Sequence, residues 1–306
     1  MTAMLRVGTR GSPLALAQTD EVVGRLRAIR PDLRTKTVVI RTHGDEGYRE
    51  DLGTALDGKR AFTKRIEDSL LEGHIDFAVH SLKDLPTEIA AGLVIAAIPP
   101  REDPRDVFVG RDAMTPDDLG PGVRVGTSSL RRRAQLLSRW PGLRVIDLHG
   151  NVNTRLRRLD SNDFDAVVVA AAGIRRLHIE DRFTHPLSPD VMTPAPGQGA
   201  LAVEARTGDR PVLDVLAAID DPGARRTTEA ERAVSARVGG GCNIPFGALA
   251  TLDRGITLHA VLADPDGRRL IRSEGRGDES RWKEVVDSVW DKLVHQGGAD
   301  LVAQAA

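Results

Sequence analysis

A four-residue sequence occurs twice in this chain, each time at the start of the same pattern. Arg6-Val7-Gly8-Thr9 and Arg124-Val125-Gly126-Thr127 each close a short apolar stretch and lead to a serine and a helical pattern that carries Ala-Gln. In the first copy, Ser12 and Pro13 are residues that favour the start of a helix. A strand that feeds a helix is the building unit of α/β sheets, so the recurrence predicts two similar α/β domains.

A weaker repeat supports this duplication. The segments HIDFAVHSLKDLP, residues 74–86, and FDAVVVAAAGIRRL, residues 164–177, both run from an aspartate through an apolar strand to a turn with basic residues. Two proline-rich passages, residues 98–106 and 193–200, flank the second copy. Proline disfavours regular structure, so these passages predict a two-strand hinge where the chain crosses to the second domain and returns.

The pattern changes after residue 219. A charged helix with a capping box from Thr228 to Glu231 is expected there, then a hairpin around Pro265-Asp266-Gly267 and a last helix from about Glu279. We predict an α/β fold whose third domain is a small α+β unit of antiparallel sheet with helices. The predicted domains are residues 1–99 with 200–218, residues 100–199, and residues 219–306.

Composition narrows the possible partners. The net charge is −1, which gives no general attraction to nucleic acid or membranes. No apolar run approaches the roughly 18 residues of a membrane span, and no leader opens the chain, so the cytoplasm is the expected location. One cysteine excludes an intramolecular disulfide framework and a cysteine-rich metal site, and no metal is expected.

Cations and hydroxyls gather at the predicted strand-to-helix turns. Ligands of open α/β sheets bind at these turns, where helix N-termini and arginine favour anions, so the sequence predicts a ligand with several anionic groups. For any single arginine, a solvated helix face is an equally good interpretation. The residues concerned are Thr9, Arg10, Ser12, Ser81, Lys83, Thr127, Ser128, Ser129, Arg131, Arg132, Arg175 and Arg176.

Asp84 is the one acid among these cations. It either caps a helix or pairs with Lys83, or it stabilises positive charge on a reacting group or moves a proton. His80 lies in an apolar strand and fits a core histidine better than a catalyst. The polar, glycine-rich segment Thr42 to Arg60 is a candidate mobile lid, and Phe62 after it is core or a ring contact.

Cys242, the only cysteine, lies in VGGGCNIPFG, residues 238–247. A free cysteine is usually a small buried hydrophobe. Three glycines before it and Asn243-Ile244-Pro245 after it describe a loop tip instead, where a thiolate is a nucleophile or a covalent tether.

The motifs together resemble one family over essentially the whole chain. ERAVSARVGGGCNIPFG, with GTRGSPLALAQ, AVHSLKDLP, VGTSSLRRRAQL, GNVNTRL and PAPGQGAL, resembles the porphobilinogen deaminases, also called hydroxymethylbilane synthases. The resemblance implies two domains like type II periplasmic binding proteins and a third that carries a dipyrromethane cofactor on Cys242 through a thioether. It implies a transferase of heme biosynthesis that condenses four porphobilinogen molecules, with loss of ammonia, into linear hydroxymethylbilane.

The resemblance also assigns residues and partners. Asp84 would be the catalytic aspartate that holds pyrrole N–H groups. The resemblance further implies a monomeric enzyme whose product passes to uroporphyrinogen III synthase. Besides Cys242 and Asp84, cofactor contacts would come from Ser81, Lys83, Thr127, Ser129, Arg131, Arg132, Arg155 and Gly173. Substrate contacts would come from Arg10, Ser12, Lys59, Phe62, His149, Arg155 and Arg176.

Three positions depart from the family pattern. His149 stands where arginine is common, Ala55 where many members have lysine, and Arg60 where glycine is usual. A histidine is only partly charged near neutral pH, so His149 predicts a weaker or pH-dependent grip on substrate. A further alternative is an enzyme-like chain that has lost activity through the changes at His149 and in the lid. The main rival hypothesis is a sensor or transporter component that binds a polycarboxylate, because two α/β units with a hinge suit that class equally well. Cys242 separates the two, since a plain binder needs no glycine-mounted thiol.

Overall fold

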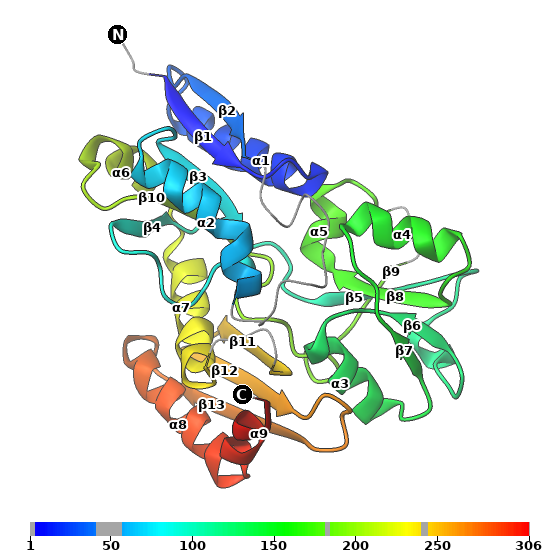
Figure 1. Ribbon diagram of the computed structural model, residues 1–306. Helices are drawn as coiled ribbons and strands as arrows, with labels where there is room; N and C mark the ends of the chain where they lie inside the picture. Colours follow the sequence, from blue (N-terminus) through cyan, green and yellow to red (C-terminus); the bar gives the residue numbers. More distant parts are fainter. Residues whose placement is uncertain (1–3, 41–56, 181–183, 240–243, 306) are drawn as a thin grey trace. The chain divides into compact units, whose positions relative to one another are not determined.

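The computed structural model describes residues 4–40, 57–180, 184–239 and 244–305 (Figure 1). They form two compact units, Met1–Glu102 with Ala200–Arg226, and Asp103–Gly199 with Thr227–Ala306. Two of the unit boundaries fall in the proline-rich passages, and one falls within a helix. The division into three domains stays a prediction.

The first unit contains a five-stranded sheet in the order β2-β1-β3-β10-β4. Strands β1, β2 and β3 are parallel, and β10 runs antiparallel to both of its neighbours. Val7, Phe77 and Val203 anchor the core between the sheet and helix α1. The elements are β1 (Leu5–Thr9), α1 (Pro13–Ile29), β2 (Thr35–Val39), α2 (Asp57–Leu71), β3 (Phe77–Ser81), η2 (Leu82–Asp84), β4 (Leu93–Ala97), β10 (Leu201–Arg206), α6 (Arg210–Leu216) and η4 (Ala217–Ile219).

The second unit repeats this topology in the sheet β7-β6-β8-β5-β9. Its β6, β7 and β8 are parallel, and β5 is antiparallel to β8 and β9. Strand by strand, β6 corresponds to β1, β8 to β3 and β5 to β10, so the predicted duplication is confirmed. The elements are β5 (Asp106–Gly110), η3 (Pro116–Asp118), β6 (Arg124–Gly126), α3 (Leu130–Arg139), β7 (Arg144–Ile146), α4 (Val152–Asp160), β8 (Ala166–Ala170), α5 (Ala171–Arg176) and β9 (Thr184–Pro186).

The same ion pair locks the start of both sheets. Asp76, just before β3, accepts hydrogen bonds from the backbone N–H of Arg6 at 2.6 Å and from its Nη2 at 2.7 Å. Asp165, just before β8, accepts from the backbone N–H of Arg124 at 2.9 Å and from its Nη2 at 2.7 Å. The repeated arginine and aspartate of the sequence are therefore partners in space.

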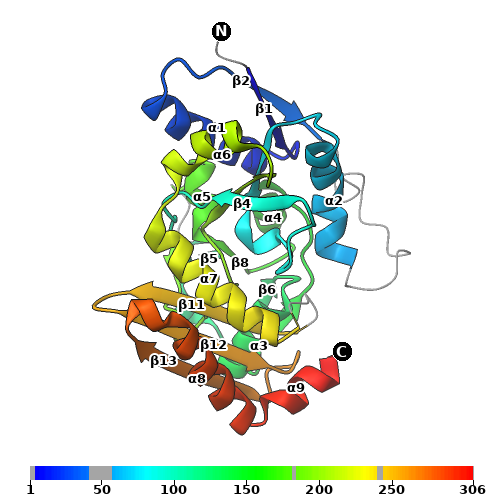
Figure 2. The same cartoon turned by 90° about the vertical axis from the view of Figure 1, so that its left-hand side faces the viewer.

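The second unit also holds the sheet β11-β12-β13, which is antiparallel throughout. Helices α7 and α8 lie along this sheet (Figure 2) and share one apolar core with it, which includes Val234, Leu258 and Val289. The predicted hairpin is confirmed between β12 and β13, with Gly267 at φ 68°. The elements are α7 (Pro222–Arg237), β11 (Phe246–Leu252), β12 (Ile256–Ala263), β13 (Leu270–Gly277), η5 (Glu279–Arg281), α8 (Trp282–His295) and α9 (Gly298–Ala305).

The capping box predicted at Thr228 and Glu231 is wrong. Helix α7 begins at Pro222, and the backbone N–H of Ala224 donates to Asp221 Oδ1 at 2.7 Å. An aspartate followed by proline starts the helix well before Thr228, so Thr228 and Glu231 are buried in its interior. The α/β fold class with a small antiparallel α+β part is confirmed. Among the described helices, none has the length and apolar character needed to cross a membrane.

Candidate functional site

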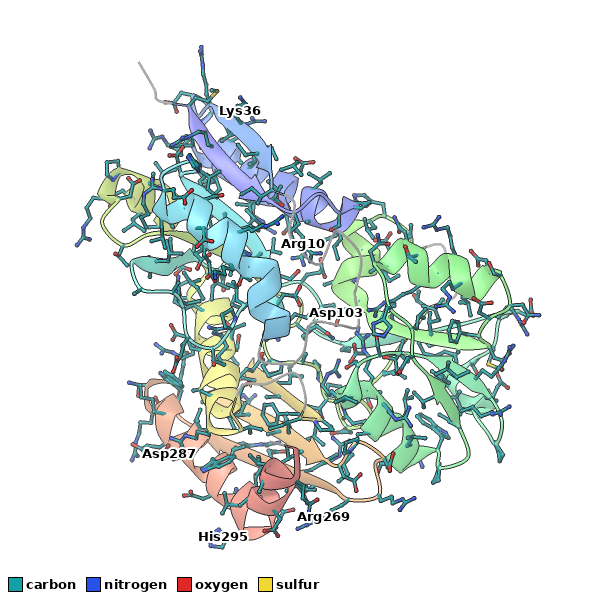
Figure 3. The ribbon with its side chains drawn as sticks, in the orientation of Figure 1. Arg10, Lys36, Asp103, Arg269, Asp287 and His295 are labelled. Carbon is teal, nitrogen blue, oxygen red and sulfur yellow. The ribbon has the colours of Figure 1, made fainter. Side chains whose placement is uncertain are left out.

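The turn after β1 brings two of the predicted hydroxyls together. Thr9 is buried, and its Oγ1 donates to the carbonyl of Ala15 at 3.2 Å. Ser12 caps α1 by accepting from the backbone N–H of Ala15, also at 3.2 Å. Arg10 lies between them, at the N-terminal end of α1 (Figure 3). The positive end of a seventeen-residue helix and a guanidinium thus belong to one turn, which suits an anion.

Asp84 stands on a short turn whose apolar residues fix it to the first sheet. The turn η2 follows β3 directly, and Leu82 and Leu85 on either side of Asp84 are each 1% exposed. Asp84 itself is exposed, and Lys83 is half-buried. The buried leucines therefore hold the backbone while the carboxylate of Asp84 faces solvent, where a ligand can reach it.

Ser81, the last residue of β3, pairs with a residue that the sequence reasoning did not single out. Gln18 of α1 is buried, and its Nε2 donates to Ser81 Oγ at 2.8 Å. The recurring Ala-Gln of both helices was the signal that could have identified it. His80 is buried as predicted, with its Nε2 3.1 Å from Glu204 Oε2 on β10.

The equivalent turn of the second unit has the same construction. Ser129 caps α3 by accepting from the backbone N–H of Arg132 at 3.4 Å. Thr127 is buried, and its Oγ1 accepts from the backbone N–H of Ser129 at 3.2 Å. Ser128 Oγ donates to the carbonyl of Leu148 at 2.8 Å. The turn is thereby fixed on the N-terminus of a ten-residue helix.

Arg131 and Arg132 share one buried carboxylate. Asp106 on β5 is 0% exposed, and its two oxygens lie 2.7 Å from Arg131 Nη1 and 2.7 Å from Arg132 Nη2. Burial alone would raise the pKa of Asp106, but the charges of Arg131 and Arg132 outweigh it and lower that pKa far below its ordinary range. Burial lowers the pKa of Arg132, which Asp106 partly offsets. These arginines are not a solvated helix face.

Three further residues that the sequence reasoning did not identify complete this network. Gln198 Nε2 donates to Asp106 Oδ1 at 3.0 Å. The carbonyl of Thr193 accepts from Arg131 Nη1 at 2.7 Å and from Gln135 Nε2 at 3.1 Å. The passage expected to be a hinge is therefore hydrogen-bonded to α3 at Thr193 and to β5 at Gln198. Apart from the recurring glutamine, Gln135, no local pattern in the sequence indicated these long-range contacts.

The remaining predicted residues of this unit lie on α4, α5 and the loops beside them. Arg155 Nε donates to the carbonyl of Gly150 at 2.9 Å, and Arg176 Nη2 donates to the carbonyl of Gly199 at 3.1 Å. Gly173 is buried within α5, and His149 is exposed just before α4. Each unit therefore holds its own group of the predicted contacts.

Several predicted residues lie outside what the structure describes. Cys242 lies between the described residues Gly239 and Ile244, and residues 41–56 of the predicted lid, which include Ala55, are likewise not described. Lys59, Arg60 and Phe62 fall in the first turns of α2, where only the helix itself is described. Their assignments stay predictions.

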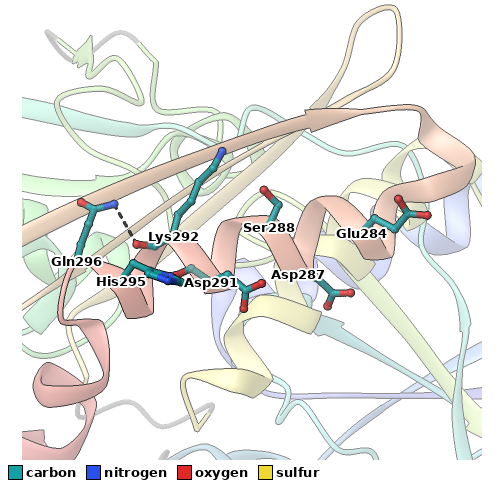
Figure 4. Close-up of a pocket in the computed structure, with 7 residues that line it drawn as sticks. All are labelled: Glu284, Asp287, Ser288, Asp291, Lys292, His295 and Gln296. Carbon is teal, nitrogen blue, oxygen red and sulfur yellow. Dashed lines mark hydrogen bonds between the residues drawn. The ribbon is translucent and has the colours of Figure 1, made fainter.

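A surface hollow of about 700 Å³ runs along α8 (Figure 4). Three of its side chains, Glu284, Asp287 and Asp291, are acids, which would repel a polycarboxylate ligand, so the hollow does not fit the predicted ligand. Within the described residues, no group of His, Cys, Asp and Glu is arranged to hold a metal ion. The hollow is lined by Glu284, Asp287, Ser288, Asp291, Lys292, His295 and Gln296.

Comparison with known families gives one answer over nearly the whole chain. Residues 5–214 match the family model described as porphobilinogen deaminase, dipyromethane cofactor binding domain, and residues 226–295 match porphobilinogen deaminase, C-terminal domain. The chain belongs to the porphobilinogen deaminase family. The second match includes Cys242, and the first includes Asp84 and the arginines of both turns.

Individual porphobilinogen deaminases are similar to this chain over nearly their full length. The protein of Thermus thermophilus is 46% identical over 97% of this chain and 98% of its own, and that of Acidithiobacillus ferrooxidans is 45% identical over 99% and 98%. Among solved structures, substrate binding domain 2 of Lactococcus lactis GlnP is 13% identical with a TM-score of 0.44, covering 77% of this chain and 90% of that one. A likeness that low supports no statement about binding.

Proposed function

We propose that this chain is the enzyme that condenses four porphobilinogen molecules head to tail, releasing ammonia and giving the linear tetrapyrrole hydroxymethylbilane. The observation that carries the proposal is the match to both porphobilinogen deaminase family models, together with Cys242 and Asp84 in the matched motifs. A plain polycarboxylate binder is not favoured, because such a protein has no use for the matched C-terminal domain.

The donor set of the second unit fits a dipyrromethane cofactor, whose pyrrole rings carry acetate and propionate groups. Arg131 Nε and Nη2 donate to no protein group in the described part of the chain, and the N-terminus of α3 lies beside them in sequence. Guanidinium and helix N-termini are the groups that bind carboxylates best. Cys242 would hold the cofactor covalently, with Ser81, Lys83, Thr127, Ser129, Arg131, Arg132, Arg155 and Gly173 around it.

When bound, this cofactor supplies a free pyrrole carbon on which the product chain is built. Asp84 would accept hydrogen bonds from pyrrole N–H groups, and its negative charge would stabilise the positive charge that develops when ammonia leaves. Asp84 is exposed on η2, which suits this role because a ligand can reach its carboxylate. Arg10, Ser12, Lys59, Phe62, His149, Arg155 and Arg176 would hold the carboxylates and ring of incoming substrate.

An intact-mass measurement tests the covalent attachment. Protein purified from a host that makes porphobilinogen should carry an added mass and give a colour with Ehrlich's aldehyde reagent. Cys242→Ser should lose both. Asp84→Ala should keep the adduct and lose turnover, because Asp84 acts on the reaction and not on the attachment. Wild-type protein without an adduct would contradict the tether, and normal turnover by Asp84→Ala would contradict its catalytic role.

The proposal extends to the setting of the enzyme. It would act as a monomer in the cytoplasm and pass its product to uroporphyrinogen III synthase. Sedimentation should then give a single species near the chain mass of 33.1 kDa. A stable dimer at micromolar concentration would contradict the monomer.

A further inference from the structure

The charged cluster formed by Asp106, Arg131 and Arg132 has no charged equivalent at the matching positions of the first unit. In each unit the serine cap hydrogen-bonds to the residue three positions later, which is Ala15 in the first unit and Arg132 in the second. Counting from these caps, Leu14 corresponds to Arg131. The same topology is therefore built once with apolar residues and once with two arginines at the start of the helix.

The carboxylate also has an apolar counterpart. Asp106 is the β5 residue opposite Ala170, the last residue of β8, and Leu201 is the β10 residue opposite Ser81, the last residue of β3. Leu201 is 2% exposed and belongs to the core of the first sheet. Replacing a buried ion pair by apolar side chains is often neutral or stabilising, so stability alone gives no reason for the charged version.

Asp106 fixes both guanidiniums in orientation. Its Oδ1 accepts from Arg132 Nε at 3.0 Å and from Arg132 Nη2 at 2.7 Å, while its Oδ2 accepts from Arg131 Nη1 at 2.7 Å. Each arginine also donates to one backbone carbonyl, Arg132 to that of Val168 and Arg131 to that of Thr193. Because each guanidinium group donates to two or more acceptors, neither arginine side chain has much freedom to rotate.

The cluster keeps a surplus of positive charge. Two guanidiniums face one carboxylate, and Gln198, the other side chain that donates to Asp106, is neutral. Arg272 of β13 also reaches this network, since its Nη1 donates to Thr193 Oγ1 at 2.8 Å, but Asp190 offsets its charge, so the surplus comes from Arg131 and Arg132. An anion that reached the open donors of Arg131 would meet an ordered and positive site.

We propose that Asp106 is a positioning residue, which holds Arg131 and Arg132 so that Arg131 presents Nε and Nη2 to a carboxylate of the pyrrole ligand. Asp106 is 0% exposed and cannot touch the ligand itself, so it acts only through the arginines. The inference rests on the proposed function, because that function supplies the carboxylate. Ordering the arginines beforehand spares the ligand the entropy of arranging them.

The test compares variants purified from a host unable to make porphobilinogen. Porphobilinogen is added, and the mass of the adduct on each protein is followed over time. Asp106→Asn should acquire the adduct at least about tenfold more slowly, since a buried charge pair loses one partner. The matched control is Asp165→Asn, which removes another arginine-bound aspartate of the same sheet and should load within about twofold of wild type.

A second variant covers the case in which Asp106→Asn folds poorly. The triple variant Asp106→Leu, Arg131→Leu, Arg132→Ala copies the first unit and should match the wild-type urea midpoint while failing to load. Equal loading rates of Asp106→Asn and Asp165→Asn, or normal loading of the triple variant, would overturn the inference.

A ligand-free measurement separates this inference from the proposed function. Urea unfolding of Asp106→Asn, Arg132→Gln and the double variant should show coupling, with the double variant no less stable than Asp106→Asn alone. Additive losses would overturn the positioning role even if the wild type loads normally. A wild-type protein that neither loads nor consumes porphobilinogen would instead overturn the proposed function and, with it, the ligand part of the inference.

Discussion

The carboxylate of Glu231 accepts a hydrogen bond of 2.7 Å from the backbone N–H of Gly197, and its other oxygen accepts one of 2.8 Å from Ala250. Glu231 is 0% exposed, so it joins α7, β11 and the proline-rich passage away from water. Cys242 lies in sequence between α7 and β11. A buried carboxylate therefore ties together both segments that flank the cysteine.

Glu231→Gln should lower the free energy of unfolding by about 2–3 kcal/mol, because the amide can accept only one of the two hydrogen bonds and leaves a backbone N–H unsatisfied. Urea unfolding followed by circular dichroism measures this. Exposed Glu180 offers the matched control, and Glu180→Gln should change stability by less than about 0.5 kcal/mol. Equal effects of the two changes would refute the role of Glu231.

Gly247 leaves no room for a side chain. A Cβ there would lie 2.7 Å from the carbonyl oxygen of Thr193 and 2.9 Å from that of Pro194. Gly247→Ala should therefore cost about 1–3 kcal/mol of stability. Exposed Gly24, within α1, has nothing within 4 Å, so Gly24→Ala should raise stability by about 0.5–1 kcal/mol through helix propensity. Thermal unfolding of the two variants should thus move in opposite directions.

Asp165 should contribute to the pH dependence of stability. Its hydrogen bonds from Arg124 lower its pKa in the folded protein. Its stabilising effect is therefore fully present above the unfolded pKa of about 3.9 and is lost as the pH falls through the folded pKa. Asp165→Asn should be less stable than wild type at pH 7, and the difference should shrink as the pH falls below about 4. A difference that stays constant down to about pH 2 would contradict this account, and Asp20→Asn, on an exposed face of α1, is the control.

His149→Arg should strengthen substrate binding. Arginine always carries its charge and presents a planar fork of donors that matches a carboxylate. The KM for porphobilinogen should fall by about two- to fivefold, the effect of one exposed ion pair. Steady-state kinetics of wild type and variant measure this. An unchanged KM would remove His149 from the substrate contacts.

Local signals in the sequence foretold much of the fold. Arg6-Val7-Gly8-Thr9 and its copy identified two equivalent sheets because strand, turn and helix cap lie within a few residues of one another. Pro265-Asp266-Gly267 identified the hairpin for the same reason. The capping box predicted from Thr228 was wrong, because a threonine and a glutamate three residues apart occur in helix interiors as well as at helix starts. Asp221 and Pro222 determine where α7 begins.

Contacts between distant segments could not be foreseen. Asp106 lies 25 positions from Arg131 and 92 from Gln198, and nothing around it in the sequence marks it as the centre of a buried network. The sequence showed the cations at the turns, but it did not show that the carboxylate of Asp106 binds two of them, Arg131 and Arg132. Such pairing depends on strand order and register, which only the folded chain displays.

The balance of porphobilinogen and ammonia tests the central claim most directly. Purified wild-type protein carrying its adduct is mixed with porphobilinogen, and substrate loss, ammonia and tetrapyrrole are measured in the same reaction. We predict catalytic consumption, with four ammonia molecules released for each linear tetrapyrrole formed. Binding of porphobilinogen without release of ammonia, the behaviour of a polycarboxylate binder, would contradict the account.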